Sequence, residues 1–272
     1  IFLRSVGNHY TILLFVFAFI TVSSWFFVIS KQSKNVYISL IIYFSSLGMF
    51  FYSLSNIRQG LAIAVGFLGF HYLAKGKNLL AFLFIFLAPF FHMSGIVCIL
   101  FIPFKKIRLN RKVYKFFLLA FIIVFPFSKQ IATTALAFFP QYSSYLESSW
   151  FLNSNKWAPI FLTIWQGLVL IFGEFVIRKK NLTTEEEYIR SLFFISFLFT
   201  VSSLQTSLFG RFAHYFTPFI CLYIPIILSK IGDKKVQWIL FYLLILIYAS
   251  IFLVIVYFKA DWYQIVPYRS II

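Results

Sequence analysis

Long apolar runs separated by short polar segments dominate the chain. The runs fall at about residues 10–29, 36–54, 57–74, 79–104, 116–127, 157–177, 188–204, 212–229 and 236–258. Most of them approach the roughly 20 residues that an α-helix needs to cross a bilayer. Runs such as LLAFLFIFLAPFF show no period of two, which argues against a membrane β-barrel. The pattern predicts an all-α, polytopic transmembrane helical bundle with about nine to ten spans, forming a single integral membrane domain over residues 1–272.

Composition strengthens this prediction and limits the partners. The chain is 61% hydrophobic and 11% charged, whereas soluble domains are about 45–50% apolar and about 25% charged. Its net charge is +17, but the basic residues gather in short loops between apolar runs, as membrane topology requires. We therefore expect the lipid bilayer as a partner and no nucleic acid. Cys98 and Cys221 lie inside apolar runs without metal-ligand spacing, so we expect no metal and no other cofactor.

The run at 79–104 contains a break that matters for topology. Pro89 removes a backbone donor and clashes with the preceding turn. If the run enters the membrane and returns as two half-helices meeting near Pro89 and His92, most of the 24 Lys and Arg residues fall on one side of the bilayer. We therefore expect a hairpin here, with a water-filled cavity around its turn. The chain also opens in mid-pattern at Ile1, and we expect that it lacks N-terminal spans.

The segment 128–156 is the longest stretch without a clear span. It is rich in aromatic and polar residues, which favour the headgroup level of a membrane. We expect an interfacial loop with a short surface helix. Beyond it, Glu174 lies one helical turn before Arg178, and we expect these two side chains to form an ion pair.

The first candidate site residue is Arg58, flanked by Asn56 and Gln59 at the start of an apolar run. A guanidinium binds phosphate through two hydrogen bonds and keeps its charge at every physiological pH. The start of a helix also favours negative charge. These residues are candidates for gripping an anionic substrate. The alternative is an arginine that extends to lipid headgroups.

The second candidate is His92, beside the proline break, with Ser94 within hydrogen-bonding reach. Histidine suits proton transfer because its pKa is near neutral. The alternative is a histidine that only satisfies a hydrogen bond inside the bundle, as we expect for His71. No Ser-His-Asp set accompanies His92 in the sequence.

The third candidate is Arg211 with His214 and Tyr215, which the spacing places on one face of a helix. Two arginines and two histidines around one cavity would suit a diphosphate. Among the few acids, Asp261 and Glu147 are predicted outside, and either is a candidate general base. A solvated loop carboxylate is the alternative for both.

Four short motifs along the chain resemble the EpsG-like family of Wzy-type bacterial polysaccharide polymerases. The motifs are N-I-R-Q-x-x-A at 56–62, F-H-x-S at 91–94, R-x-x-x-Y-F at 211–216 and V-P-Y at 266–268. By motif match, the family's Arg-Gln pair falls on Arg58 and Gln59, its histidine on His92 and its second arginine on Arg211. The resemblance also adds Tyr268 to the candidate substrate-binding residues.

The resemblance implies a multi-pass enzyme in the cytoplasmic (inner) membrane of a bacterium. Such an enzyme transfers an undecaprenyl-diphosphate-linked glycan onto a lipid-linked repeat unit at the outer face, and builds exopolysaccharide, capsule or O-antigen. It implies no cofactor, and its expected partners include a chain-length regulator and a flippase. Family members also carry acidic and aromatic motifs in earlier spans, to which nothing corresponds here.

Two other functions fit the same composition. A flippase or transporter of lipid-linked oligosaccharides would have a basic cavity reaching both faces. A membrane O-acyltransferase of surface glycans would also use histidine and arginine, but would take its acyl group from the cytoplasmic side. The side of the membrane on which His92 and Arg211 lie distinguishes the three functions.

Overall fold

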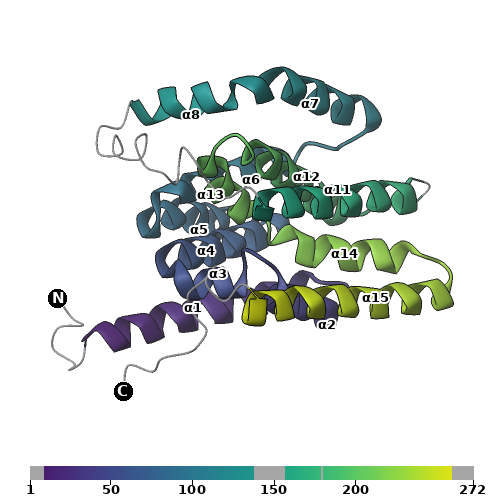
Figure 1. Ribbon diagram of the computed structural model, residues 1–272, viewed down its shortest axis with the longest axis horizontal. Helices are drawn as coiled ribbons and strands as arrows, with labels where there is room; N and C mark the ends of the chain where they lie inside the picture. Colours follow the sequence, from purple (N-terminus) through teal and green to yellow (C-terminus); the bar gives the residue numbers. More distant parts are fainter. Residues whose placement is uncertain (1–8, 138–156, 179, 259–272) are drawn as a thin grey trace. The chain divides into compact units, whose positions relative to one another are not determined.

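The computed structural model describes residues 9–137, 157–178 and 180–258 (Figure 1). These residues form helices and the turns between them, without a strand, so the all-α prediction is confirmed for this part of the chain. The chain divides into two compact units, residues 1–102 with 220–272 and residues 103–219.

The first unit holds the N-terminal helices together with the last two. Its elements are α1 (His9–Gln32), α2 (Val36–Ser45), α3 (Phe50–Ser55), α4 (Ile57–Ala74), α5 (Asn78–Phe91), the 3₁₀ helix η2 (Met93–Leu100), α14 (Phe219–Lys230), α15 (Lys234–Leu253) and the π-helical η5 (Val254–Phe258), with α6 (Phe101–Phe104) at its boundary. The second unit holds α7 (Arg111–Val124), η3 (Phe125–Phe127), α8 (Ser128–Ala137), α11 (Trp157–Ile177), α12 (Thr184–Ser202) and α13 (Ser207–Phe216).

Helix α4 is the centre of the first unit and packs against both α1 and α5. Glycine makes the contact with α5 close, because a Cβ on Gly69 would lie 2.8 Å from Cγ1 of Ile85. On the α1 side, the ring of Trp25 lies 5.1 Å from that of Phe67 and 4.6 Å from that of Tyr43. Burial of these large rings stabilises the unit through dispersion and ring-edge contacts.

A hydrogen bond between α1 and α4 shows which helix ends of this unit lie together. Gln32 at the end of α1 and His71 near the end of α4 are buried and joined by a hydrogen bond of 2.8 Å between Nε2 and Nδ1. The basic segments that follow α1 and α4 therefore lie at the same end of the unit. Arg58, at the start of α4, lies at the opposite end. This arrangement within the unit is the one that the charge pattern predicts.

The prediction of nine to ten spans is not confirmed. Within the described residues, five helices are long and apolar enough to cross a membrane, or six if α13 and α14 are counted as one broken span. The reason is that several apolar runs divide into short helices. The run 36–54 breaks between α2 and α3 around Gly48, whose φ of 87° is a backbone conformation that favours glycine.

The second unit is held together by α11 and α12. Buried Gln166 of α11 accepts a hydrogen bond of 3.2 Å from the hydroxyl of Thr200 on α12. Helix α12 begins earlier than its apolar run predicts, because Thr183 and Glu186 form a capping box at its start. At the other end of α12, Phe199 packs against aromatic rings of α13.

The segment 128–156, where an interfacial loop with a short surface helix is expected, begins with a helix. Residues 128–137 form α8, which follows α7 and η3, and a span candidate runs from Lys112 to Thr134. Ser128 to Ala137 contains good helix formers and no glycine or proline, so the helix continues beyond the apolar run. Residues 138–156, including Glu147, lie outside the described residues.

Candidate functional site

Arg58 is exposed in the first turn of α4, where the sequence predicts an anion-binding group. Asn56 immediately before the helix is also exposed, and its amide donates to Oγ of Ser55 over 3.0 Å. Asn56 makes no side-chain cap on the helix. The helix start carries a partial positive charge, and the guanidinium of Arg58 is also positive. Both charges favour an anion at this position.

Gln59 differs from Arg58 in its surroundings. Only 3% of its surface is exposed, and its Oε1 accepts a hydrogen bond of 2.6 Å from the hydroxyl of Tyr52 on α3. This bond ties α3 to the first turn of α4, directly beside Arg58.

His92 and Ser94 are brought together, as the sequence predicts. The distance between Nδ1 of His92 and Oγ of Ser94 is 2.7 Å. His92 is the residue at which α5 ends, and its backbone is extended, with φ −154° and ψ 124°. The bond holds the half-buried imidazole in a defined orientation at the turn between α5 and η2.

The turn at His92 reverses the direction of the chain. A Cβ on Gly95 would lie 2.7 Å from the carbonyl carbon of Ala88, so η2 begins pressed against the last turn of α5. Further along η2, Cys98 lies against Gly66 of α4, where a Cβ would be 2.5 Å from Sγ. The segment thus divides at His92 into two short helices, and the second returns along the first.

Arg58 and His92 lie at the same end of the first unit. Helices α4 and α5 are antiparallel neighbours joined by a short turn, with Gly69 of α4 against Ala81 and Ile85 of α5. The start of α4 and the end of α5 are therefore at one end of this pair. Two of the three residues on which the predicted chemistry depends therefore lie at the same end of this helix pair.

Arg211, His214 and Tyr215 lie on α13, in the second unit. The helical spacing is the predicted one, and Tyr215 is buried at 2% exposure, whereas Arg211 and His214 are half-buried. The grouping of Arg211 with Arg58 and His92 stays a prediction. Asp261 and Tyr268 lie outside the described residues.

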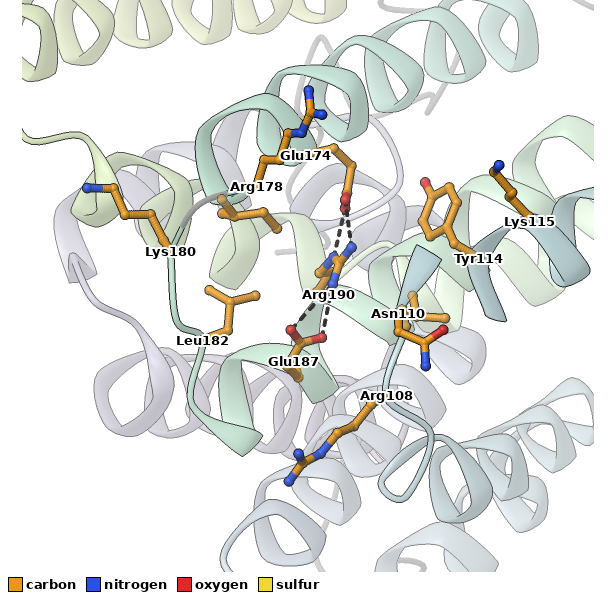
Figure 2. A pocket seen from close by; sticks show the side chains of 12 residues that line it. Arg108, Asn110, Tyr114, Lys115, Glu174, Arg178, Lys180, Leu182, Glu187 and Arg190 are labelled. Carbon is orange, nitrogen blue, oxygen red and sulfur yellow. Dashed lines mark hydrogen bonds and ion pairs between the residues drawn. The ribbon is translucent and has the colours of Figure 1, made fainter. Parts of the chain in front are cut away.

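The sequence does not predict a second polar site that lies wholly within the second unit. A pocket of about 560 Å³ is lined by the segment before α7, the end of α11 and the start of α12. Figure 2 shows Arg190 of α12 at its centre, between Glu174 of α11 and Glu187 of α12. The cations Arg108, Lys115, Arg178 and Lys180 also line it.

Arg190 forms a bidentate pair with Glu174. Its Nε donates to Oε1 over 2.7 Å and its Nη2 donates to Oε2 over 2.6 Å, while Nη1 donates to Oε2 of Glu187 over 3.1 Å. The expected pairing of Glu174 with Arg178 is wrong. Local helical spacing suggests Arg178, but the neighbouring helix offers a guanidinium in the fork geometry that a carboxylate prefers.

The described residues contain no cluster of three or more His, Cys, Asp and Glu side chains that could hold a metal ion.

Comparison with known proteins gives one result for the whole chain. A family model described as the EpsG family matches residues 1–270. No curated protein and no solved structure matches the chain. The family match covers nearly the entire sequence, and the described part holds several apolar helices of membrane-spanning length. The chain is a multi-pass membrane protein that belongs to the EpsG family.

Proposed function

We propose that this protein is a polysaccharide polymerase. It would transfer a glycan from undecaprenyl diphosphate onto a lipid-linked repeat unit at the outer face of the bacterial cytoplasmic membrane. The observation that carries the proposal is the EpsG family match over residues 1–270. The placement of Arg58 and His92 at one end of the α4–α5 pair supports it.

Arg58 would stabilise the leaving group. Transfer breaks the bond between the sugar's anomeric carbon and a diphosphate oxygen, and the negative charge grows on the diphosphate. An exposed guanidinium at the positive end of α4 offers two hydrogen-bond donors and a fixed charge to that group. Stabilisation of charge that develops in the transition state is often the largest catalytic contribution. Arg211 would add a second cation to the same leaving group.

His92 would accept the proton of the attacking hydroxyl. In the tautomer in which Nδ1 donates to Oγ of Ser94, the lone pair on Nε2 can take that proton as the new glycosidic bond forms. The bond to Ser94 holds the orientation of the ring. Asp261, predicted outside, is the alternative base, and Asn56, Gln59, His214, Tyr215 and Tyr268 would contact or position the substrate.

The proposed function can be tested by a genetic experiment that measures the length of the surface polysaccharide chains. A strain lacking this protein is complemented with the natural chain or with Arg58→Ala, and its surface polysaccharide is separated by size on a gel. Arg58→Ala should remove long chains while single repeat units remain on the lipid. Arg58→Lys should restore them only in part, because a point charge does not reproduce the guanidinium fork.

The matched control is Lys77→Ala, an exposed cation at the opposite end of the α4–α5 pair. It should leave the chain lengths unchanged at equal protein level in the membrane. A normal distribution of polysaccharide chain lengths in Arg58→Ala would count against the proposed role of Arg58. So would an equal loss of long chains in Lys77→Ala.

A further inference from the structure

The basic pocket of the second unit has walls that the fold holds in place. The hydroxyl of Ser191 on α12 donates to the carbonyl of Glu187 over 2.8 Å and lies 3.4 Å from the carbonyl of Ile107, so the segment before α7 lies against α12. The ring of Tyr114 on α7 packs against Phe194 of α12 at 4.3 Å. Asn110 caps α7 by accepting from the amides of Lys112 and Val113 at 3.0 Å each. The pocket is therefore built from three anchored segments.

The charge of this pocket is unbalanced. Both of its carboxylates, Glu174 and Glu187, are engaged by Arg190. Within the described part of the chain, no ion pair neutralises the four other cations that line it, namely Arg108, Lys115, Arg178 and Lys180. Figure 2 shows the four cations on different sides of Arg190, with the charged ends of Arg108, Arg178 and Lys180 extending away from it. Four cations on the walls of one pocket, without a carboxylate partner among the described residues, favour an anion.

The position of the pocket indicates where that anion comes from. Helices α7 and α11, whose ends form two of its walls, are both candidate membrane spans. Their exposed faces carry large apolar side chains such as Phe116 and Phe175. Leu109, Ile177 and Leu182 line the pocket beside the cations. The pocket lies at the ends of two candidate spans and is lined by both cations and apolar side chains. This position and this lining are those expected of a site at the level of the lipid headgroups.

We propose that this pocket binds a phosphate-bearing anion, and that its natural source is the headgroup of an anionic phospholipid. The cations Arg108, Lys115, Arg178 and Lys180 would engage the phosphates. The phenol of Tyr114 and the apolar side chains would face the glycerol and the first carbons of the acyl chains. A volume of about 560 Å³ falls within the roughly 300–1,000 Å³ that small-molecule sites occupy.

This site is distinct from the one proposed for polymerisation. It involves neither Arg58 nor His92, and the charge pattern predicts its cations on the cytoplasmic side. Anionic lipids give the cytoplasmic leaflet its negative surface potential. Occupation would hold the segment before α7, the end of α11 and the start of α12 together. The inference does not rest on the polymerase assignment.

The test uses the full-length purified chain after removal of bound lipid. Phosphatidylglycerol, cardiolipin and phosphatidylcholine are added in separate titrations, and inorganic diphosphate is titrated as a soluble phosphate ligand. Native mass spectrometry counts the bound molecules. The variant is Lys115→Gln/Lys180→Gln, which removes two exposed cations from the pocket. The control is Lys234→Gln/Lys235→Gln, which removes two exposed lysines at the start of α15.

The natural chain should bind the anionic lipids and not phosphatidylcholine. The pocket variant should bind them about 30-fold more weakly, since each of the two cations removed contributes on the order of 1 kcal/mol near a membrane surface. The control should bind as the natural chain does. Saturable binding of diphosphate that the pocket variant loses would also support phosphate recognition, and would identify a soluble ligand as the source.

Two results would overturn the proposal. Unchanged lipid and diphosphate binding by Lys115→Gln/Lys180→Gln would show that the pocket is not the site. An equal loss from both double variants would show that binding depends on overall charge alone. Because all four lysines are exposed, thermal unfolding of each variant should match that of the natural chain, which keeps either outcome interpretable.

Discussion

Arg190 binds Glu174 across two helices through two hydrogen bonds of 2.7 and 2.6 Å, so that a guanidinium from α12 closes onto a carboxylate from α11. The Arg190 side chain is 10% exposed and that of Glu174 is 35% exposed. Glu187, one turn before Arg190, adds a second carboxylate to the same guanidinium. This cluster joins the end of one helix to the start of the next.

The first prediction concerns this pair. Arg190→Met should lower the free energy of unfolding by about 2 kcal/mol, because it leaves two carboxylates close together without their shared cation. Thermal unfolding followed by tryptophan fluorescence in detergent measures the change. Arg178→Met is the control and should have little effect, since Glu174 does not pair with it. If Arg178→Met lowered the stability more than Arg190→Met, Glu174 would pair with Arg178, as helical spacing suggests.

The second prediction concerns the reversal at His92. Gly95→Ala should destabilise the protein by about 1–3 kcal/mol, as overpacking does, because the added Cβ would lie 2.7 Å from the carbonyl carbon of Ala88. That contact is with backbone, which cannot move aside as a flexible side chain can. Gly232→Ala is the matched control, since a Cβ there meets no atom within 4 Å. Equal stability of the two variants would show that η2 does not press against α5.

Uninterrupted apolar runs predict their helices well. The runs 57–74 and 157–177 coincide with α4 and α11, because polar residues flank each run and no residue within them stops the helix. The break at His92 also follows from the sequence, since Pro89 weakens the last turn of α5.

Features that depend on tertiary contacts cannot be predicted in this way. Gly48 lies with a positive φ in the turn between α2 and α3, inside an apolar run, and hydropathy does not reveal that turn. The pocket around Arg190 brings the segment 108–115 against residues 174–190, which are distant from it in sequence, and hydropathy does not reveal that contact. For the candidate site, local spacing predicts the bond between His92 and Ser94, but not the burial of Gln59.

The third prediction concerns the partner of the proposed base. Ser94→Ala should slow chain growth by about five- to tenfold, the value of one hydrogen bond that orients a side chain. Ser94→Thr keeps the hydroxyl and should recover most of the rate. The measurement is polymer formation by purified protein from lipid-linked repeat units. Equal rates for the alanine and threonine variants would mean that the hydroxyl of Ser94 does not act through His92.

The last prediction separates the two histidines of the first unit. His71 is 7% exposed, bonded to Gln32 and in edge contact with the ring of Phe27 at 5.1 Å. His71→Ala should therefore lower the free energy of unfolding by about 2 kcal/mol, since it removes both contacts and leaves the buried amide of Gln32 without this bond. At a temperature where the variant stays folded, polymer length should be unchanged.

His92→Ala should give the opposite result. His92 lies half-buried at a helix end, so the unfolding temperature should move little, while the rate of chain growth should fall by about 10²–10⁴-fold, as loss of a general base does. Measuring both quantities on both variants distinguishes a structural role from a chemical one. If His71→Ala stopped polymerisation in the folded protein and His92→Ala did not, the proton acceptor would have to be sought at the basic end of α4.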